Sequence, residues 1–352
     1  MTGFISSAPG KLVLFGEYAV LEGSSALVTA VDRRARVRFE RAEGDALMLS
    51  AKPLGLSRFP IYRGGSLICG VENERRAGLV VEVLELMCTE FPSLRESLQG
   101  GHLDIDTQEM SLAHGGAKLG VGSSAAVAAA LVGGIGFLLS DQSFEPRKIF
   151  ELAHRAHLRF QGGRGSGIDV AAASFGGTLS FKGSQGRSLP KSETRKWPAG
   201  LRWQVVGTGS AASTSDFLAA LRGWKDNSPN DYCSLIQKMQ SLSDTVAQAE
   251  SGDWIEWSLT WCRFLEELGQ QIGMPIMSEE HCRFRDFAVE MGLGYKPSGA
   301  GGGDAGFFVI PEERSLDEVR TLIKGRNIHM LPLSPDANGV QVEGLESSES
   351  QD

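Results

Sequence analysis

The chain has 352 residues, of which 41% are hydrophobic and 22% charged, a balance typical of a globular protein with room for two domains or one large one. Its formal net charge of −8 argues against nucleic acid or an acidic membrane as the main partner. The five cysteines form no C-x-x-C pair, which favours reduced thiols and a cytoplasmic location. No signal-peptide pattern begins the chain, and no uninterrupted apolar run reaches the roughly 18 residues of a membrane span.

Hydrophobic periodicity predicts a mixed fold. In chain order we expect a strand at 34–40, a helix at 79–91, a strand at 102–106, helices at about 124–140 and 147–160, and a turn and strand at 175–181. Further on we expect mostly helix from about 213 to 291, then a helix at about 315–325 between strands near 305–310 and 338–342. Strands and helices mixed in this way favour an α+β fold.

A change in composition predicts the domain boundary. Residues 182–200 are rich in Lys, Ser, Gly and Pro, which are typical of a connecting segment. We therefore expect one domain over 1–190 and a second over 191–345. The tail, 346–352, is rich in serine and acidic residues, which predicts disorder.

The segment Gly120-Val121-Gly122-Ser123-Ser124 is followed at once by an Ala-rich run of good helix formers. A glycine loop that opens onto a helix N-terminus presents unpaired backbone N–H groups and a partial positive charge. This arrangement predicts a phosphate-binding loop. The chain contains no Walker A string, and no buried strand precedes the loop as a dinucleotide fingerprint would require. Ser123 or Ser124 is also a candidate N-cap of the helix, which does not exclude a ligand.

Two further motifs accompany this loop. One runs from Ala8 to Leu21 with the sequence APGKLVLFGEYAVL, and the other from Lys296 to Asp304 with the sequence KPSGAGGGD. The three motifs, in this order and spacing, resemble those of the GHMP kinases. The resemblance covers most of the chain and is weak between about 190 and 290. It implies a two-domain fold, with a ribosomal protein S5 domain 2-like first half and a ferredoxin-like second half.

Within that family the chain resembles the phosphomevalonate kinase branch. The segment Gln161-Gly162-x-x-Gly165-Ser166-Gly167-x-Asp169 looks like that branch's version of the catalytic aspartate motif. Mevalonate kinases usually have Gly where this chain has Asp304, and His where it has Tyr18. They also carry a metal-binding Glu eleven residues before the aspartate, where this chain has Leu158.

The resemblance implies ATP and Mg²⁺ as cofactors, phosphomevalonate as the small-molecule substrate, and a monomer or homodimer. Lys11 would stabilise charge on the transferred phosphoryl group, and Asp169 would orient or deprotonate the acceptor. An N-cap role for Asp169 is the alternative. The expected nucleotide-binding residues are Lys118, Gly120, Gly122, Ser123, Ser124 and Ala125, with Ser123 and Ser124 also the expected metal ligands. The expected substrate-binding residues are Tyr18, Ala19, Arg164, Ser166, Gly167, Ser298, Gly299, Ala300, Gly301 and Gly302.

Three other residues have more than one interpretation. Glu17 is either part of the site or a structural partner of a Lys or Arg. His154 and His157 lie three residues apart on a predicted helix and lack metal-binding spacing with carboxylates, so we expect packing or hydrogen bonding from them. The alternative functions are mevalonate kinase, with an alcohol acceptor, and a lyase similar to diphosphomevalonate decarboxylase.

Overall fold

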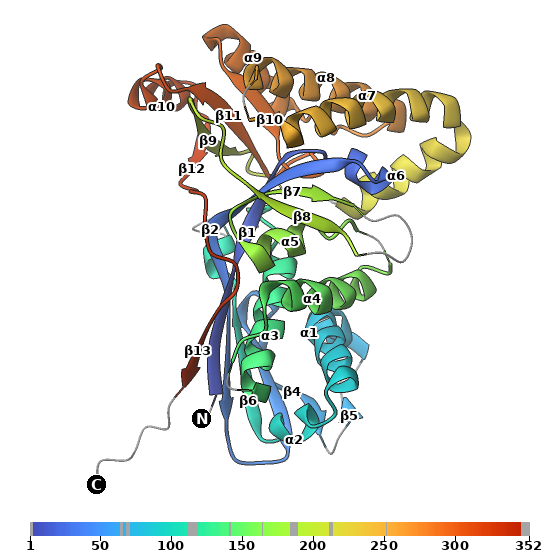
Figure 1. The fold of residues 1–352 in the computed structure, drawn as a ribbon, viewed down its shortest axis with the longest axis vertical. Coiled ribbons are helices and arrows are strands. Elements are labelled where there is room, and N and C mark those ends of the chain that lie inside the picture. The colour runs from blue at the N-terminus through green and yellow to red at the C-terminus, as the bar shows by residue number, and fades with distance from the viewer. Residues whose placement is uncertain are drawn as a thin grey trace.

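The computed structural model describes residues 3–63, 66–67, 71–111, 119–140, 142–163, 165–183, 189–210, 214–250 and 252–345. These residues form two β-sheets, one at each end of an elongated molecule, with helices packed on both (Figure 1). The mixture of strands and helices confirms the predicted mixed two-part architecture.

The large sheet holds nine of the described strands. Its main path runs β13-β1-β2-β6-β3-β4-β5, and β7 joins it by pairing with β2 and carries β8. The strands are β1 (Gly3–Phe15), β2 (Ser25–Arg41), β3 (Ala46–Ala51), β4 (Leu56–Arg63), β5 (Ser66–Leu67), β6 (Gly101–Asp106), β7 (Thr178–Lys182), β8 (Lys191–Arg195) and β13 (Gln341–Leu345). Short 3-10 turns lie between them at η1 (Ala19–Glu22), η2 (Lys52–Leu54) and η3 (Gln108–Met110).

Strand β2 illustrates how the sequence sets this sheet. Ala35, Val37 and Phe39 are fully buried, whereas Arg36 and Arg38, which alternate with them, are exposed. This alternation places every second side chain in the core and the others in solvent. The strand is long enough for its first half to pair with β7 and its second half with β6.

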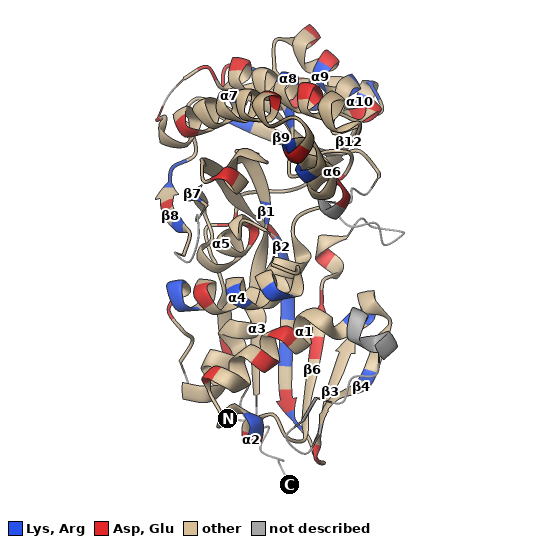
Figure 2. Cartoon of the chain, turned by 90° about the vertical axis from the view of Figure 1, so that its right-hand side faces the viewer, with Lys and Arg blue, Asp and Glu red and all other residues tan. Residues whose placement is uncertain are grey.

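Helices α1 (Val71–Glu90), α2 (Leu94–Ser97), α3 (Ser123–Ser140), α4 (Pro146–Phe160) and α5 (Ile168–Phe175) belong to this first part. Helix α3 packs against β1 and β2 and carries no charged residue (Figure 2). By length and composition it would suffice to cross a membrane, contrary to the expectation from the sequence. Two thirds of it is buried inside the protein, however, under α1, α4 and α5. Its apolar surface is therefore the core of this part of the fold.

The second sheet has the order β10-β11-β9-β12. Its strands are β9 (Leu201–Gly207), β10 (Gly294–Pro297), β11 (Ala305–Pro311) and β12 (His329–Leu331). The helices of this part are α6 (Thr214–Asn227), α7 (Pro229–Gln248), α8 (Trp254–Ile272), α9 (Glu279–Met291) and α10 (Leu316–Gly325). The predicted helical stretch over 213–291 is confirmed by α6 to α9.

Two strands that the sequence analysis placed in the second domain lie in the large sheet instead. Strand β8 pairs with β7, and β13 pairs with the first residues of β1. Strand β8 pairs with the strand just before it, whereas the partner of β13 lies more than 300 residues away and is not signalled by the local sequence. The described part of the second domain therefore lies between β8 and the segment that leads to β13.

Candidate active site

A cavity of about 330 Å³ lies where the three sequence motifs meet. Residues of β1 and the turn after it, the glycine loop before α3, the loop before α5, and the segment after β10 all line it. Lys11 is the only cationic side chain among its described lining residues. The residues that the GHMP resemblance singled out thus come together from segments that are far apart in sequence.

Lys11 is held by the phosphate loop itself. Its backbone N–H donates to the carbonyl of Val121 over 2.8 Å, and its Nζ donates to the carbonyl of Gly120 over 3.2 Å. Both partners belong to the loop that precedes α3. The ammonium group is therefore fixed beside the N-terminus of α3. The ammonium charge and the helix dipole both contribute positive potential at this point.

The glycine loop differs in detail from the expectation. Helix α3 begins at Ser123, and the N–H of Ala126 donates to the Gly122 carbonyl, so Gly122 occupies the N-cap position expected of Ser123 or Ser124. The Ser124 hydroxyl lies 3.0 Å from Nε2 of the buried His157. Ser123 has no side-chain hydrogen bond to any described residue. Its hydroxyl is therefore the freer of the two to meet a ligand in the cavity that both serines line.

The two loop glycines are required by side chains of the protein. A Cβ built at Gly122 would lie 3.3 Å from carbons of Lys11 and 3.7 Å from Cβ of Asp169. A Cβ at Gly120 would lie 2.4 Å from Cβ of Asp304. Both glycines also have positive φ, +71° at Gly120 and +78° at Gly122, which disfavours other residues. The loop thus lets Lys11, Asp169 and Asp304 approach the helix N-terminus.

Asp169 is the second residue of α5, and Gly167 in the left-handed conformation occupies the N-cap position. The proposed N-cap alternative for Asp169 is therefore wrong. The carboxylate accepts a hydrogen bond from the N–H of Val170 over 2.9 Å and lines the cavity. Gly167 itself packs against the ring of His154, which stacks on Phe150 with ring centroids 5.5 Å apart. The expected packing and hydrogen-bonding roles of His154 and His157 are confirmed.

The third motif is tied to the first by hydrogen bonds. The Ser298 hydroxyl accepts from the N–H of Val13 over 2.9 Å, and the Tyr18 hydroxyl donates to the Ala300 carbonyl over 2.5 Å. Burial, together with the nearby Glu17 carboxylate, raises the pKa of Tyr18 above its usual range. Tyr18 is therefore a neutral donor that joins the two motifs.

A buried ion pair lies directly below this junction. Lys296 Nζ contacts Glu17 Oε1 at 2.6 Å, and both side chains are almost completely buried. The ammonium also donates to the carbonyls of Pro297 at 2.5 Å and Val13 at 3.4 Å, and the N–H of Gly299 donates to Glu17 Oε1 at 3.2 Å. Burial lowers the pKa of Lys296. Glu17 is therefore the structural partner of a lysine, and it also lines the cavity, so the structure agrees with both interpretations that the sequence left open.

The structure sorts the predicted site residues into three groups. Those that line the cavity are Lys11, Tyr18, Gly120, Gly122, Ser123, Ser124, Ser166, Asp169, Ser298, Gly299 and Ala300. Ala19, Ala125, Gly167, Gly301 and Gly302 are not among its lining residues. Lys118 and Arg164 lie outside the described residues.

Gly301 and Gly302 serve packing within the second domain. A Cβ at Gly301 would lie 2.5 Å from the Ile276 carbonyl oxygen, and one at Gly302 would lie 2.4 Å from the ring of Phe217. These two glycines therefore pack against α6 and the segment before α9, and their substrate contact stays a prediction. Asp304 and Gln161 line the cavity although the sequence analysis assigned them no ligand. Gln161 lies in the motif that contains Asp169, and Asp304 ends the motif that begins at Lys296. Their position in these motifs could have identified them as site residues.

Comparisons with known proteins agree with this geometry. The family described as "GHMP kinases N terminal domain" matches residues 78–177. The phosphomevalonate kinase of a Streptomyces species is 28% identical over 96% of this chain and 98% of its own length. The mevalonate kinase of Pyrococcus horikoshii is 30% identical over 69% of this chain and 68% of its own length. The structure of Streptococcus pneumoniae phosphomevalonate kinase, in complex with phosphomevalonate and AMPPNP, has a TM-score of 0.74 at 18% identity, covering 94% of this chain and 99% of that one.

Proposed function

The chain belongs to the GHMP kinases, a family that includes its mevalonate-pathway relatives, and we propose that it transfers the γ-phosphoryl group of ATP to 5-phosphomevalonate. An oxygen of the acceptor phosphate would bond to the γ-phosphorus while the bond from that phosphorus to the β,γ-bridging oxygen breaks. The products are ADP and 5-diphosphomevalonate.

One observation carries the choice of acceptor. The Gly165–Asp169 segment and Asp304, the two features most similar to the phosphomevalonate kinase branch, both line the cavity that holds Lys11. Leu158, where mevalonate kinases usually have a metal-binding Glu, is not among the cavity's lining residues. Residues that resemble the phosphomevalonate branch thus occupy the place where an acceptor would meet the phosphate loop.

We propose a role for each group. The N-terminus of α3 and Lys11 attract the nucleotide phosphates and stabilise the charge that develops during transfer. Asp169 lies across Gly122 from Lys11, so the two can hold an acceptor oxygen between them. The phosphate acceptor is largely ionised at neutral pH, so Asp169 contributes more by positioning than by removing a proton.

Mg²⁺ fits the oxygen donors present. The Ser123 hydroxyl and the Asp169 and Asp304 carboxylates are the hard ligands that this ion prefers, and all three line the cavity. Among the described residues there is no cluster of three or more His, Cys, Asp or Glu that could bind a metal alone. This agrees with an ion that arrives with ATP and takes much of its coordination from phosphates and water. When bound, Mg²⁺ would neutralise phosphate charge.

We propose that the reaction takes place in the cytoplasm.

The test is a coupled assay of ADP release by the full chain, with phosphomevalonate and mevalonate compared at several concentrations. We expect kcat/KM to be at least tenfold higher for phosphomevalonate, a difference of about 1.4 kcal/mol in transition-state stabilisation. Asp169→Asn is the control that assigns the ADP to this site. Equal or better use of mevalonate would contradict the proposal.

Mevalonate kinase is the second candidate, because enzymes of that name are also among the curated relatives at similar identity. The small number of cationic groups among the described lining residues also suits an uncharged acceptor group. The same assay separates the two activities. Measurement of CO₂ release from diphosphomevalonate tests the lyase alternative.

A further inference from the structure

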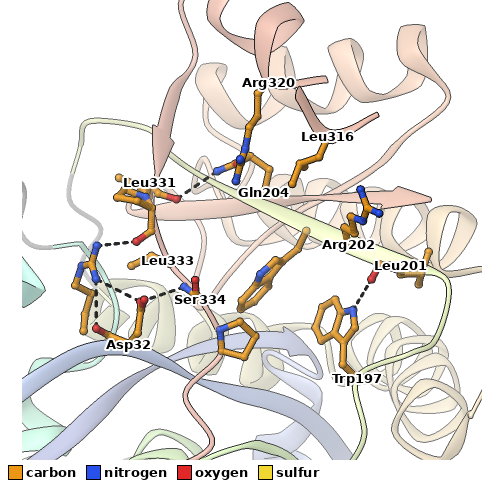
Figure 3. A pocket seen from close by; sticks show the side chains of 14 residues that line it. Asp32, Trp197, Leu201, Arg202, Gln204, Leu316, Arg320, Leu331, Leu333 and Ser334 are labelled. Atoms are coloured by element: carbon orange, nitrogen blue, oxygen red, sulfur yellow. Dashed lines mark hydrogen bonds and ion pairs between the residues drawn. The ribbon is translucent and has the colours of Figure 1, made fainter. Parts of the chain in front are cut away.

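A second cavity, of about 570 Å³, lies between the two sheets. It is lined by residues of β2, β9, α10 and the segment that follows β12 (Figure 3). Its volume is in the range of small-molecule sites, about 300–1,000 Å³. It shares no lining residue with the candidate active site. The proposed kinase reaction therefore does not account for it.

One wall of this cavity is aromatic. The rings of Trp197 and Trp203 contact each other with centroids 5.1 Å apart and planes inclined at 52°. The Trp197 indole N–H is satisfied within the protein, because it donates to the Leu201 carbonyl over 2.9 Å. The Trp197 indole therefore offers its face for apolar contact without needing a polar partner.

Arg320 of α10 is held in place by a buried glutamine. Its Nε donates to Gln204 Oε1 over 2.8 Å, and Gln204 is only 5% exposed. The Gln204 amide nitrogen donates to the carbonyls of Val205 at 2.9 Å and Leu331 at 3.3 Å, which fixes the orientation of the amide. Arg320 thus keeps both Nη groups available, since no described residue accepts a hydrogen bond from them.

The remaining charges of the cavity divide into a satisfied pair and one further cation. Arg33 lies 3.4 Å from Asp32 and also donates to the Pro332 carbonyl over 2.6 Å, so these two charges compensate each other. The side chain of Arg202, in β9, has no hydrogen bond or ion pair to any described residue. Figure 3 shows Arg202 and Arg320 near α10 and Leu316, with Asp32 on the other side. In a chain of net charge −8, this cavity therefore carries two guanidinium groups without an ionic partner among the described residues, and Arg320 is bonded only through its Nε to the neutral Gln204.

From this combination we propose that the cavity binds a small anion with a flat apolar body. The anionic group would lie between Arg202 and Arg320, where guanidinium N–H groups match the oxygens of a carboxylate, sulfonate or phosphate. Arg202 and Gln204 alternate with Trp203 along β9, so the two arginines lie on one face of this strand and the indoles on the other. The flat body would therefore pass around the edge of β9, before the residues that pair with β12, and pack on Trp197 and Trp203. A bound molecule would connect α10 and β9 of the second sheet to the segment that lies beside β2.

The experiment uses the full chain and two fluorescent probes with the same ring system. The anionic probe is 8-anilinonaphthalene-1-sulfonate, and the uncharged one is N-phenyl-1-naphthylamine. We expect one saturable site for the sulfonate, with energy transfer from tryptophan, and at least tenfold weaker binding of the uncharged probe. The doubly substituted variant Arg202→Gln/Arg320→Gln should weaken sulfonate binding at least tenfold. Arg147→Gln, which changes an exposed arginine of α4, should leave it unchanged.

Three outcomes would overturn the proposal. They are equal binding of the two probes, sulfonate binding that the double variant leaves intact, and displacement of the sulfonate by AMPPNP, which would place the dye in the other cavity. Circular dichroism of the double variant checks its fold, which we expect to be unchanged because both arginines are exposed. A second variant, Trp197→Phe, keeps both charges and removes one indole. It should lower the energy transfer and weaken sulfonate binding, and unchanged values for both would also contradict the proposed site.

Discussion

Replacing Lys296 with methionine removes one partner of the buried ion pair while nearly keeping the length of the side chain. The Glu17 carboxylate is then left with the N–H of Gly299 as its remaining donor, because its Oε2 already has no partner among the described residues. Glu17 is only 5% exposed, although it lines the candidate active-site cavity, so we expect water to replace the lost ammonium poorly. Removing one member of a buried pair in this way costs about 3–5 kcal/mol.

The assay is urea denaturation, followed by circular dichroism and tryptophan emission, of the wild type, Lys296→Met, Glu17→Gln and the double variant. We expect Lys296→Met to lower the free energy of unfolding by about 3–5 kcal/mol. The double variant should be about 2 kcal/mol more stable than the sum of the single effects predicts, because it leaves no unpaired charge. This coupling energy separates the ion pair from general loss of packing.

The matched control is the exposed pair Arg326–Glu290, whose Nη2 and Oε1 lie 2.7 Å apart, against 2.6 Å in the buried pair, but whose side chains are 53% and 55% exposed. Arg326→Met should change the free energy of unfolding by at most about 1 kcal/mol. If Lys296→Met costs no more than this control, water reaches Glu17 and the reasoning from burial is refuted.

Gly122→Val should lower kcat at least tenfold, because the valine side chain would displace Lys11 and Asp169. The circular dichroism spectrum should stay unchanged. Turnover at the wild-type rate would show that the loop adapts to the valine. Lys11→Met and Asp169→Asn should each lower kcat on the order of 10²-fold, with smaller changes in KM. If steady-state kinetics give a near-normal kcat for one of these variants, that residue is not catalytic. Burial lowers the pKa of His281 to about 4, below its unfolded value near 6.5. The unfolded chain therefore takes up this proton first, and about 3 kcal/mol of stability present above pH 6.5 is lost as the pH falls to 4. Denaturation curves at pH 7 and 4.5 measure this loss, which His281→Gln should reduce.

Much of the fold followed from local patterns, because periodicity reports which side of an element faces the core. The alternation over 34–40 and the Ala-rich run after Ser124 became β2 and α3. The pairing of β13 with β1 did not follow, because Gln341–Leu345 is largely exposed and alternates only weakly. Which sheet accepts such an edge strand depends on a partner more than 300 residues away.

The site was predictable to the extent that its motifs are local. Lys11, the glycine loop and Asp169 could be named because each lies in a short string with a recognisable residue pattern. The reason for the glycines was not visible, since Asp304 approaches Gly120 from the other domain. Similarly, nothing near His157 in the sequence announces the hydroxyl of Ser124 as its partner.

The position of β13 also bears on how the protein is made. The ribosome delivers β1 first and β13 last, so the outer edge of β1 over residues 3–7 has no partner until residues 341–345 emerge. Throughout synthesis that edge offers open backbone groups to any extended chain nearby. The first part of the fold therefore closes only after the whole second domain has been made, although nearly all its helices are complete long before. A chain interrupted anywhere in the second domain would keep this edge exposed and would be prone to aggregation.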